Sequence, residues 1–201
     1  HPNMAAERAA WSGTGRAIAS AAARVGLTRD ELSASLASYV RSTLSGNSAF
    51  DRYVSGERSA LTEEQQAGLR LFFGKANCSS CHVGPTFSDE DFHNTGVAIH
   101  DGRVLDSGRY LVTGQEGDRG RFKTPTLREV ARTAPYMHDG SLVSLDAVID
   151  FYDRGGTSNK GLDPDIQRLH LTPAEKRSLV AFLHALSGTV VDGSKQADEP
   201  R

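Results

Sequence analysis

The sequence is poor in the residue types that build small covalent frameworks. It holds two cysteines, two methionines and one tryptophan among 201 residues, and aromatic residues make up 7% of the chain. Both cysteines lie in one five-residue segment, from Cys78 to His82. No cysteine is left for a disulfide framework or for a zinc site with several cysteine ligands. Any chemistry that needs cysteine therefore belongs to this one segment.

Long apolar runs and an excess of one charge are also absent. No stretch approaches the roughly 18 apolar residues of a membrane-spanning helix, so we expect no membrane span. The formal net charge is -2 and no basic stripe stands out, so we expect no nucleic-acid partner. The first residues, His1 to Met4, resemble neither a signal peptide nor a translation start. Either a targeting segment was removed or the chain begins inside a longer protein.

Three capping boxes predict where helices begin. In each, a threonine is followed three residues later by Glu or Gln, at Thr28–Glu31, Thr62–Gln65 and Thr172–Glu175. The apolar spacing that follows predicts helices that end before residues 45–48, at Phe73 and before Gly188. We further expect helices at residues 5–10, 16–24 and 141–152, and a connector at residues 50–56.

The stretch from Val83 to Arg132 is rich in Gly, Asp, Thr and Pro, and we expect no long helix there. A loop region of this length is unusual in a compact domain unless it wraps something functional.

The segment from Cys78 to His82 has the pattern C-x-x-C-H. Two thiols at this spacing can each add across a vinyl group of one porphyrin, and the adjacent histidine can reach the iron from the same side. The pattern therefore predicts one covalent haem c, with Cys78 and Cys81 as attachment points and His82 as proximal iron ligand. A thioredoxin-like pair would need a βαβ context, and a zinc site would need a second cysteine pair. Because haem is attached outside the cytoplasm, we expect a periplasmic or otherwise exported protein.

The second iron ligand stays open on chemical grounds. Methionine is the usual partner in small electron carriers, which favours Met137 and ranks Tyr152 lower. We interpret His170 and His184 as surface histidines. The candidates are Met4, Met137, His93, His100, His138, His170, His184 and Tyr152.

Several segments of the chain resemble bacterial di-haem cytochrome c peroxidases. The approach to the haem motif resembles the approach to the second haem of these enzymes, and a later segment resembles their MauG-like branch. The resemblance runs from about Leu27 to Gly188 and is carried by Phe72–His82, Phe122–Arg128, Thr133–Gly140 and Phe151–Gly156.

The resemblance implies roles for several residues. A tyrosine of the MauG-like branch takes the ligand position that methionine holds in the peroxidases, and that position falls on Tyr152, with Met137 as runner-up. A phenolate ligand would favour ferric iron and lower the reduction potential. Lys123 matches a basic position near a haem propionate. Thr133 and Pro135 match backbone carbonyl ligands of a calcium ion, whose remaining side-chain ligand belongs to a first haem domain.

The chain also departs from the family pattern. Members carry two C-x-x-C-H motifs and this chain has one. The segment from His1 to Met4 resembles a family stretch with an acidic residue beside the first haem, but the nearest glutamate here is Glu7. The resemblance implies the electron-transfer half of an enzyme that reduces hydrogen peroxide or shares high-valent oxidising equivalents. Its partner would be a second haem domain or a redox protein. The alternative is a one-haem electron carrier, or a haem subunit of a larger redox complex, without peroxidase activity.

We therefore expect a mainly α fold: a cytochrome c-type haem domain with long loops and an N-terminal helical arm. In this interpretation residues 1–60 form the arm and linker, residues 61–190 form the cytochrome domain, and residues 191–201 form a flexible tail.

Overall fold

The computed structural model describes residues 17, 20–21, 24–100 and 103–192. The predicted helix at residues 5–10, the candidate ligand Met4 and residues 193–201 of the expected tail lie outside the described residues. The described members of the predicted helix at 16–24 are residues 17, 20, 21 and 24, and they are helical. The chain divides into two compact units, one of residues 45–189 and one of residues 1–44 and 190–201.

Helices dominate the described residues, in agreement with the expected mainly α class. The α-helices are α2 (Arg29–Ser42), α3 (Ala49–Val54), α4 (Glu63–Phe73), α5 (Tyr110–Thr113), α6 (Leu145–Asp153) and α7 (Pro173–His184). Short 3₁₀ helices are η1 (Arg58–Ala60), η2 (Cys78–Ser80), η3 (Glu116–Asp118) and η4 (Val130–Arg132). The strands are β1 (Thr43–Gly46), β2 (Phe92–His93), β3 (Ile99–His100), β4 (Arg103–Val104), β5 (Phe122–Lys123) and β6 (Thr189–Asp192), which form the two-stranded sheets β1-β6, β2-β5 and β3-β4.

The three predicted capping boxes are confirmed at the starts of α2, α4 and α7. In each, the threonine hydroxyl accepts from the backbone N–H three residues on, and the side chain at that position accepts from the threonine N–H. These bonds satisfy N–H groups that a helix start otherwise leaves unpaired. The helix predicted at 141–152 begins later, at Leu145, because the backbone of Leu142 pairs with Tyr136 and Ser144 caps the first turn. Helix α7 ends at His184, earlier than predicted.

The connector predicted at residues 50–56 is wrong, because this segment forms helix α3. Ser48 and Asp51 make a fourth capping box, with the Asp51 carboxylate accepting from the Ser48 N–H at 2.9 Å. Six residues are too few to show helical periodicity, so the cap was the only indication in the sequence.

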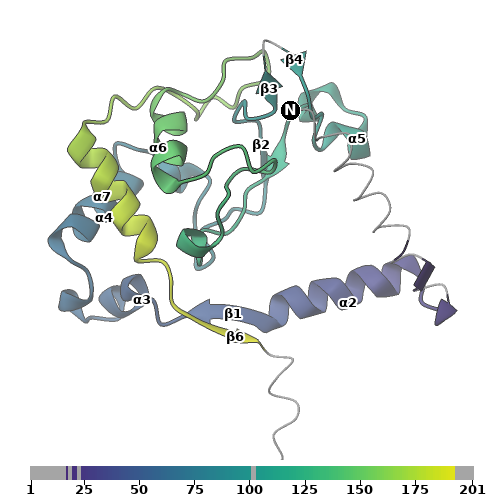
Figure 1. The fold of residues 1–201 in the computed structure, drawn as a ribbon, viewed down its shortest axis with the longest axis horizontal. Coiled ribbons are helices and arrows are strands. Elements are labelled where there is room, and N and C mark those ends of the chain that lie inside the picture. The colour runs from purple at the N-terminus through teal and green to yellow at the C-terminus, as the bar shows by residue number, and fades with distance from the viewer. Residues whose placement is uncertain (1–16, 18–19, 22–23, 101–102, 193–201) are drawn as a thin grey trace, which may run out of the picture. The chain divides into compact units, whose positions relative to one another are not determined.

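Helices α4 and α7 pack against each other at one side of the larger unit (Figure 1). The crossing depends on Gly68 of α4, because a Cβ at this position would overlap the backbone carbonyl of Ser178 and approach the Phe182 Cβ to 2.7 Å. The absence of a side chain at Gly68 therefore allows the two helices to approach this closely.

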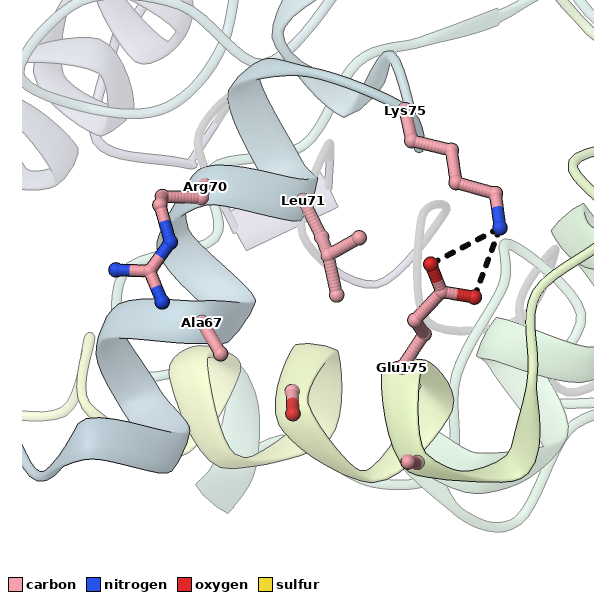
Figure 2. Close-up of a pocket in the computed structure, with 7 residues that line it drawn as sticks. Ala67, Arg70, Leu71, Lys75 and Glu175 are labelled. Atoms are coloured by element: carbon pink, nitrogen blue, oxygen red, sulfur yellow. Dashed lines mark hydrogen bonds and ion pairs between the residues drawn. The ribbon is translucent and has the colours of Figure 1, made fainter.

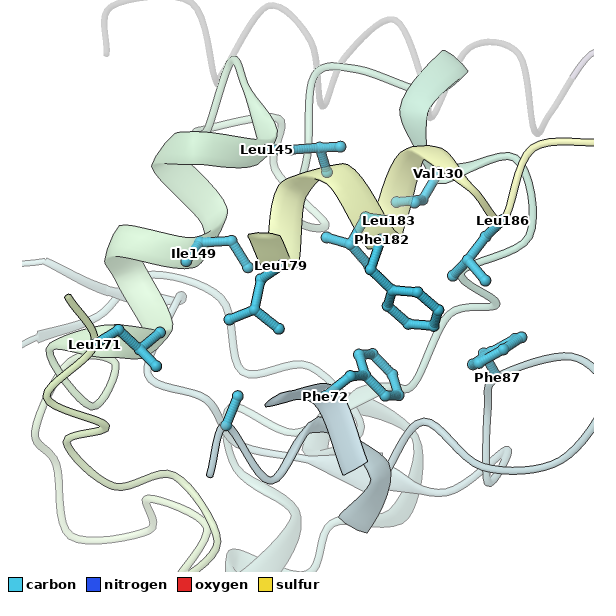
Figure 3. Close-up of a cluster of buried hydrophobic side chains, with 11 residues drawn as sticks. Phe72, Phe87, Val130, Leu145, Ile149, Leu171, Leu179, Phe182, Leu183 and Leu186 are labelled. Carbon is cyan, nitrogen blue, oxygen red and sulfur yellow. The ribbon is translucent and has the colours of Figure 1, made fainter. Parts of the chain in front are cut away.

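Phenylalanine rings pack edge to face in the core of this unit, and Figure 3 shows Phe72, Phe87 and Phe182. The rings of Phe72 and Phe182 lie 5.2 Å apart, and those of Phe50 and Phe87 lie 5.1 Å apart. The aliphatic part of the core comes from α6, α7 and the loops beside them, and consists of Val130, Leu145, Ile149, Leu171, Leu179, Leu183 and Leu186. The apolar stripes predicted for α6 and α7 face inward here.

The stretch from Val83 to Arg132 is loop-rich as predicted. Among its described residues the longest helix is α5, with four residues. Strands β2 and β5 pair antiparallel, with Phe92 opposite Lys123 and His93 opposite Phe122. Within the described part of the chain, no helix is both long and apolar enough to cross a membrane.

Candidate functional site

The two cysteines lie on one tight turn. Cys78 begins the 3₁₀ helix η2, and the N–H of Cys81 donates to the carbonyl of Cys78. Residues three apart in a 3₁₀ helix eclipse each other, so both thiols project from the same side of the turn. Both are free thiols and partly buried. Asn77 precedes the turn in a left-handed conformation, with φ at 51°, which redirects the chain after α4.

His82 is held by one ring nitrogen. Its Nδ1 lies 2.8 Å from the carbonyl oxygen of Phe87. Because a carbonyl only accepts, Nδ1 carries the proton and Nε2 keeps its lone pair for a metal. Burial lowers the pKa of His82, which favours the neutral ring that a metal needs. The backbone N–H of His82 donates to the Cys78 carbonyl at 2.9 Å, which fixes the histidine against the cysteine turn.

The thiols are protonated rather than activated. Burial raises the pKa of the Cys78 thiol to about 12 and also raises that of Cys81. A redox-active C-x-x-C pair instead has a lowered thiol pKa, which supplies its reactive thiolate. The electrostatics therefore weigh against the thioredoxin-like interpretation.

Tyr152 of α6 lies within electrostatic range of the two cysteines. The pKa of Tyr152 is raised to about 12, mainly by burial and also by charge on Cys78 and Cys81, while a hydrogen bond with Thr95 acts in the opposite direction. The two cysteines affect the phenol because they are close to it. The fold therefore places Tyr152 in the same region of the larger unit as the predicted attachment residues.

Met137, the runner-up, lies in a strained loop. Its backbone is left-handed, with φ at 70°, and its side chain is partly buried. The neighbouring His138 stacks on Phe122, with ring centroids 3.7 Å apart. The described interactions of the cysteine turn include Tyr152, and those of the Met137 loop run to Phe122 and Asp106 instead.

The other histidine candidates are engaged or exposed. His93 Nδ1 lies 2.7 Å from Asp163 and its Nε2 lies 2.9 Å from Asp89, so neither nitrogen has a free lone pair. These bonds outweigh burial and raise the pKa of His93. His170 and His184 are exposed, as interpreted from the sequence. The side chain of His100 is not among those described.

Cys81, Asp89 and His93 offer three ligand atoms within 4.8 Å of one another. A cation there would need the Cys81 thiolate and a His93 nitrogen. The Cys81 sulfur is not available if it is bonded to a haem, and the His93 Nε2 already bonds the Asp89 carboxylate. A metal site and haem attachment therefore exclude each other at this cysteine.

Lys123 and Arg121 lie two residues apart and differ in their pairing. Lys123 Nζ lies 2.5 Å from Glu90 and donates to the Thr124 carbonyl, with a side chain 46% exposed. Arg121 has a buried Nε with no hydrogen-bond partner among the described residues. An orphaned buried guanidinium N–H fits a missing anionic acceptor better than a solvated, paired lysine does.

The predicted calcium ligands lie in an exposed bend. Thr133 follows η4 and its hydroxyl donates to the Val130 carbonyl at 3.1 Å. Pro135 follows a cis peptide bond, and both residues are exposed. The bend leaves both carbonyl-bearing residues accessible to a partner from outside the described residues.

A groove of about 460 Å³ lies elsewhere, between α4 and α7 (Figure 2). Lys75 reaches across it to Glu175, with Nζ 2.8 Å from Oε2. None of the predicted site residues lines this groove, so the site is defined by the cysteine turn.

Three contributors were missed from the sequence. The Phe87 carbonyl, the Thr95 hydroxyl and the Arg121 guanidinium act through tertiary contacts that no spacing rule reports. The one usable indication was the alternation of Arg121 and Lys123, which places both on one face of an extended segment.

Comparisons with known proteins agree with the resemblance, although no family model matches the chain. The chain is 40% identical to the cytochrome-c peroxidase IdrP2 of Denitromonas iodatirespirans, over 75% of this chain and 47% of that protein. It is 39% identical to the methylamine utilization protein MauG of Methylorubrum extorquens, over 77% of this chain and 43% of that protein. The crystal structure of a MauG-like protein associated with microbial copper homeostasis superposes with a TM-score of 0.64 at 37% identity, over 71% of this chain and 52% of that one.

The chain spans about half the length of the curated relatives it matches. Its cysteine turn, helix order and loop-rich middle carry the motifs that prompted the resemblance. The chain therefore belongs to the family of bacterial di-haem cytochrome c peroxidases and MauG-like proteins.

Proposed function

We propose that this chain binds one covalent haem c and transfers electrons as the second-haem half of a MauG-like or peroxidase-type enzyme. The observation that carries the proposal is the cysteine turn. Two free thiols project from one side of it, and the next residue, His82, has its proton on Nδ1 and its lone pair on Nε2. The attachment step is an addition. Each S–H would add across one vinyl C=C of the haem. The S–H bond and the π bond would be lost, sulfur would bond one vinyl carbon, and hydrogen would bond the other.

Tyr152 is the proposed second iron ligand. The closeness of its phenol to both cysteines supports this role, and a position on α6 gives it a rigid support. A tyrosine whose pKa is near 12 stays neutral alone, so it needs ferric iron to become a phenolate. Met137 remains the runner-up.

Polar residues around the turn would orient the haem carboxylates. The family resemblance assigns this role to Lys123, and the orphaned Nε of Arg121 adds a second cation. We retain Thr133 and Pro135 as carbonyl donors to a calcium ion whose other ligands come from outside the described residues.

A bound haem supplies a one-electron store, and the chain decides its ligands and its exposure. We propose a second haem domain or a redox protein as partner and a periplasmic or otherwise exported location, since covalent haem attachment requires export. The cytochrome domain is proposed to cover residues 61–190, and the compact unit from 45 to 189 adds α3 to it.

A second function is favoured by the single C-x-x-C-H motif. In this alternative the protein is a one-haem electron carrier, or a haem subunit of a larger redox complex, without peroxidase activity.

The haem count of the native gene product separates the two. Pyridine haemochrome absorbance per polypeptide, measured together with hydrogen peroxide consumption, should give two haems and turnover if the chain is half of an enzyme. One haem without peroxide turnover supports the carrier. A native product without haem contradicts both.

A further inference from the structure

The carbonyl that holds His82 belongs to a short loop, Val83–Ser88, which we call the histidine loop. Phe87, which supplies the carbonyl, has a left-handed backbone with φ at 54° and a ring that is 1% exposed. A left-handed conformation costs a non-glycine residue roughly 1–2 kcal/mol, so the surrounding contacts must hold it. The loop therefore needs a support outside itself.

That support is the segment Thr124–Arg128, which runs from strand β5 into a turn and which we call the brace. Every second residue of the brace bonds the histidine loop. The Ser88 hydroxyl donates to the Thr124 carbonyl at 2.8 Å, the Thr126 hydroxyl donates to the Thr86 carbonyl at 2.5 Å, and the Arg128 Nε donates to the Pro85 carbonyl at 2.8 Å. Thr124 contributes its backbone carbonyl, whereas Thr126 and Arg128 contribute side-chain donors.

Arg128 anchors the brace to the rest of the domain. Its Nη1 donates to the Asp51 carboxylate at 2.8 Å and lies 3.4 Å from the Ser48 hydroxyl, at the N-terminus of α3. Its guanidinium also lies over the Phe87 ring, 5.3 Å from the centroid, and the side chain is only 13% exposed. One arginine thus holds both the loop backbone and the ring of the residue whose carbonyl faces His82.

We infer that Thr126 and Arg128 are positioning residues that fix the hydrogen bond between the Phe87 carbonyl and His82 Nδ1, and thereby set the donor strength of His82 toward iron. The inference rests on the proposed function, because it concerns the iron ligand. A strong Nδ1–H···O bond raises the basicity of a metal-bound imidazole. A more basic imidazole stabilises ferric iron, so loosening the bond raises the reduction potential.

The direction of the change in reduction potential distinguishes a positioning role of Arg128 from a simple effect of its charge. Removing the positive charge of Arg128 would, by electrostatics alone, stabilise the more positive ferric state and lower the potential. Loosening the histidine loop acts in the opposite direction. The neutral change Thr126→Val removes one support without any change of charge.

The experiment measures the reduction potential of the haem-loaded protein in Thr126→Val, Thr126→Ser, Arg128→Lys and Arg128→Met. We expect Thr126→Val, Arg128→Lys and Arg128→Met to raise the potential, and Thr126→Ser, which keeps the hydroxyl, to retain the wild-type value. Matched controls are Arg132→Met, which removes an arginine paired with Glu129 and 61% exposed, and Thr113→Val, which removes a hydroxyl bonded to Asp118. Arg132→Met should leave the potential unchanged or lower it slightly, and Thr113→Val should leave it unchanged.

The outcomes are distinct. A lower potential in Arg128→Met with no change in Thr126→Val overturns the inference and leaves a pure charge effect. Unchanged potentials in all brace variants with haem attached also overturn it, while the proposed function stands. If Arg128→Met does not fold, the Thr126→Val and Thr126→Ser pair decides. A wild-type protein without covalent haem overturns the proposed function and the inference with it.

Discussion

The orientation and protonation state of His82 and of Tyr152 have different physical causes. His82 is oriented by a backbone carbonyl, so its tautomer follows from the loop and not from a side chain that mutation could remove. Tyr152 is oriented by its place on α6 and remains neutral because burial disfavours the phenolate. In the proposed site, His82 would therefore bind iron as it stands, whereas Tyr152 would first have to lose a proton.

Replacing Tyr152 with phenylalanine tests its role. If the phenol binds iron, Tyr152→Phe changes the ferric absorption spectrum and raises the reduction potential, because a negative donor to ferric iron is lost. The measurement is a spectroelectrochemical titration of the haem-loaded protein. Tyr53→Phe is the matched control, since Tyr53 lies under the Arg58 guanidinium in the helix α3 region. An unchanged spectrum in Tyr152→Phe, together with an altered one in Met137→Ala, would assign the ligand to methionine.

The predictions for single residues rest on different kinds of information in the sequence. Cys78, Cys81 and His82 are proposed as haem residues because few other chemistries need their spacing. Tyr152 came from the resemblance, since chemistry alone favoured Met137. The unavailability of His93 came from two aspartates, at positions 89 and 163, that only the fold brings together.

At the scale of elements, helix α3 depends on a charged cap. Burial would raise the pKa of Asp51, but hydrogen bonds from Ser48 and Arg128 outweigh it and hold the pKa below its usual value. A lowered folded-state pKa stabilises the fold above the unfolded-state value near 4, and this stabilisation is lost as pH falls through the folded-state pKa. The cap should therefore fail in acid.

Asp51→Asn should lower the free energy of unfolding by about 1–3 kcal/mol at pH 7 and make its fall below pH 4 shallower. Urea denaturation of the haem-loaded protein at pH 7 and pH 3 measures both. Asp146→Asn, at an exposed first-turn position of α6, is the control and should cost less. Equal losses at both pH values in the Asp51 variant would contradict this account of the cap.

The crossing of α4 and α7 makes a second element-scale prediction. Alanine normally stabilises a helix relative to glycine by about 1 kcal/mol. At Gly68 the added Cβ would enter the Ser178 backbone, so Gly68→Ala should instead destabilise by about 1–3 kcal/mol or more. The measurement is the free energy of unfolding in urea, with Gly117→Ala as control, because a Cβ there meets no atom within 4 Å. A stabilised Gly68→Ala would show that the helices cross differently.

Helices that have both a capping box and a long apolar stripe were predicted from the sequence, whereas short helices and strands were not. Helices α2, α4 and α7 have 14, 11 and 12 residues and begin at their capping boxes. Helix α3 and the four-residue strands β1 and β6 are too short to show periodicity. The pairing of β1 with β6 also joins segments that are distant in the sequence. The late start of α6 depends on a backbone bridge between Tyr136 and Leu142.

The whole molecule belongs to a di-haem family but has a single haem-attachment motif. The chain matches peroxidases and MauG proteins over about half their length and carries one C-x-x-C-H motif. The loop-rich middle contains the histidine loop, the brace and the short sheets β2-β5 and β3-β4. The architecture that the sequence left undetermined is therefore concentrated where the cofactor is expected.

The most direct test of the central claim is the mass of the denatured polypeptide after expression with haem-attachment machinery. We predict a mass that exceeds the bare chain by one haem, with colour that stays on the protein through acid–acetone extraction. The double variant Cys78→Ser with Cys81→Ser should return the bare mass. A wild-type chain that releases all its haem on extraction, or that shows the bare mass, would contradict covalent attachment and the function proposed from it.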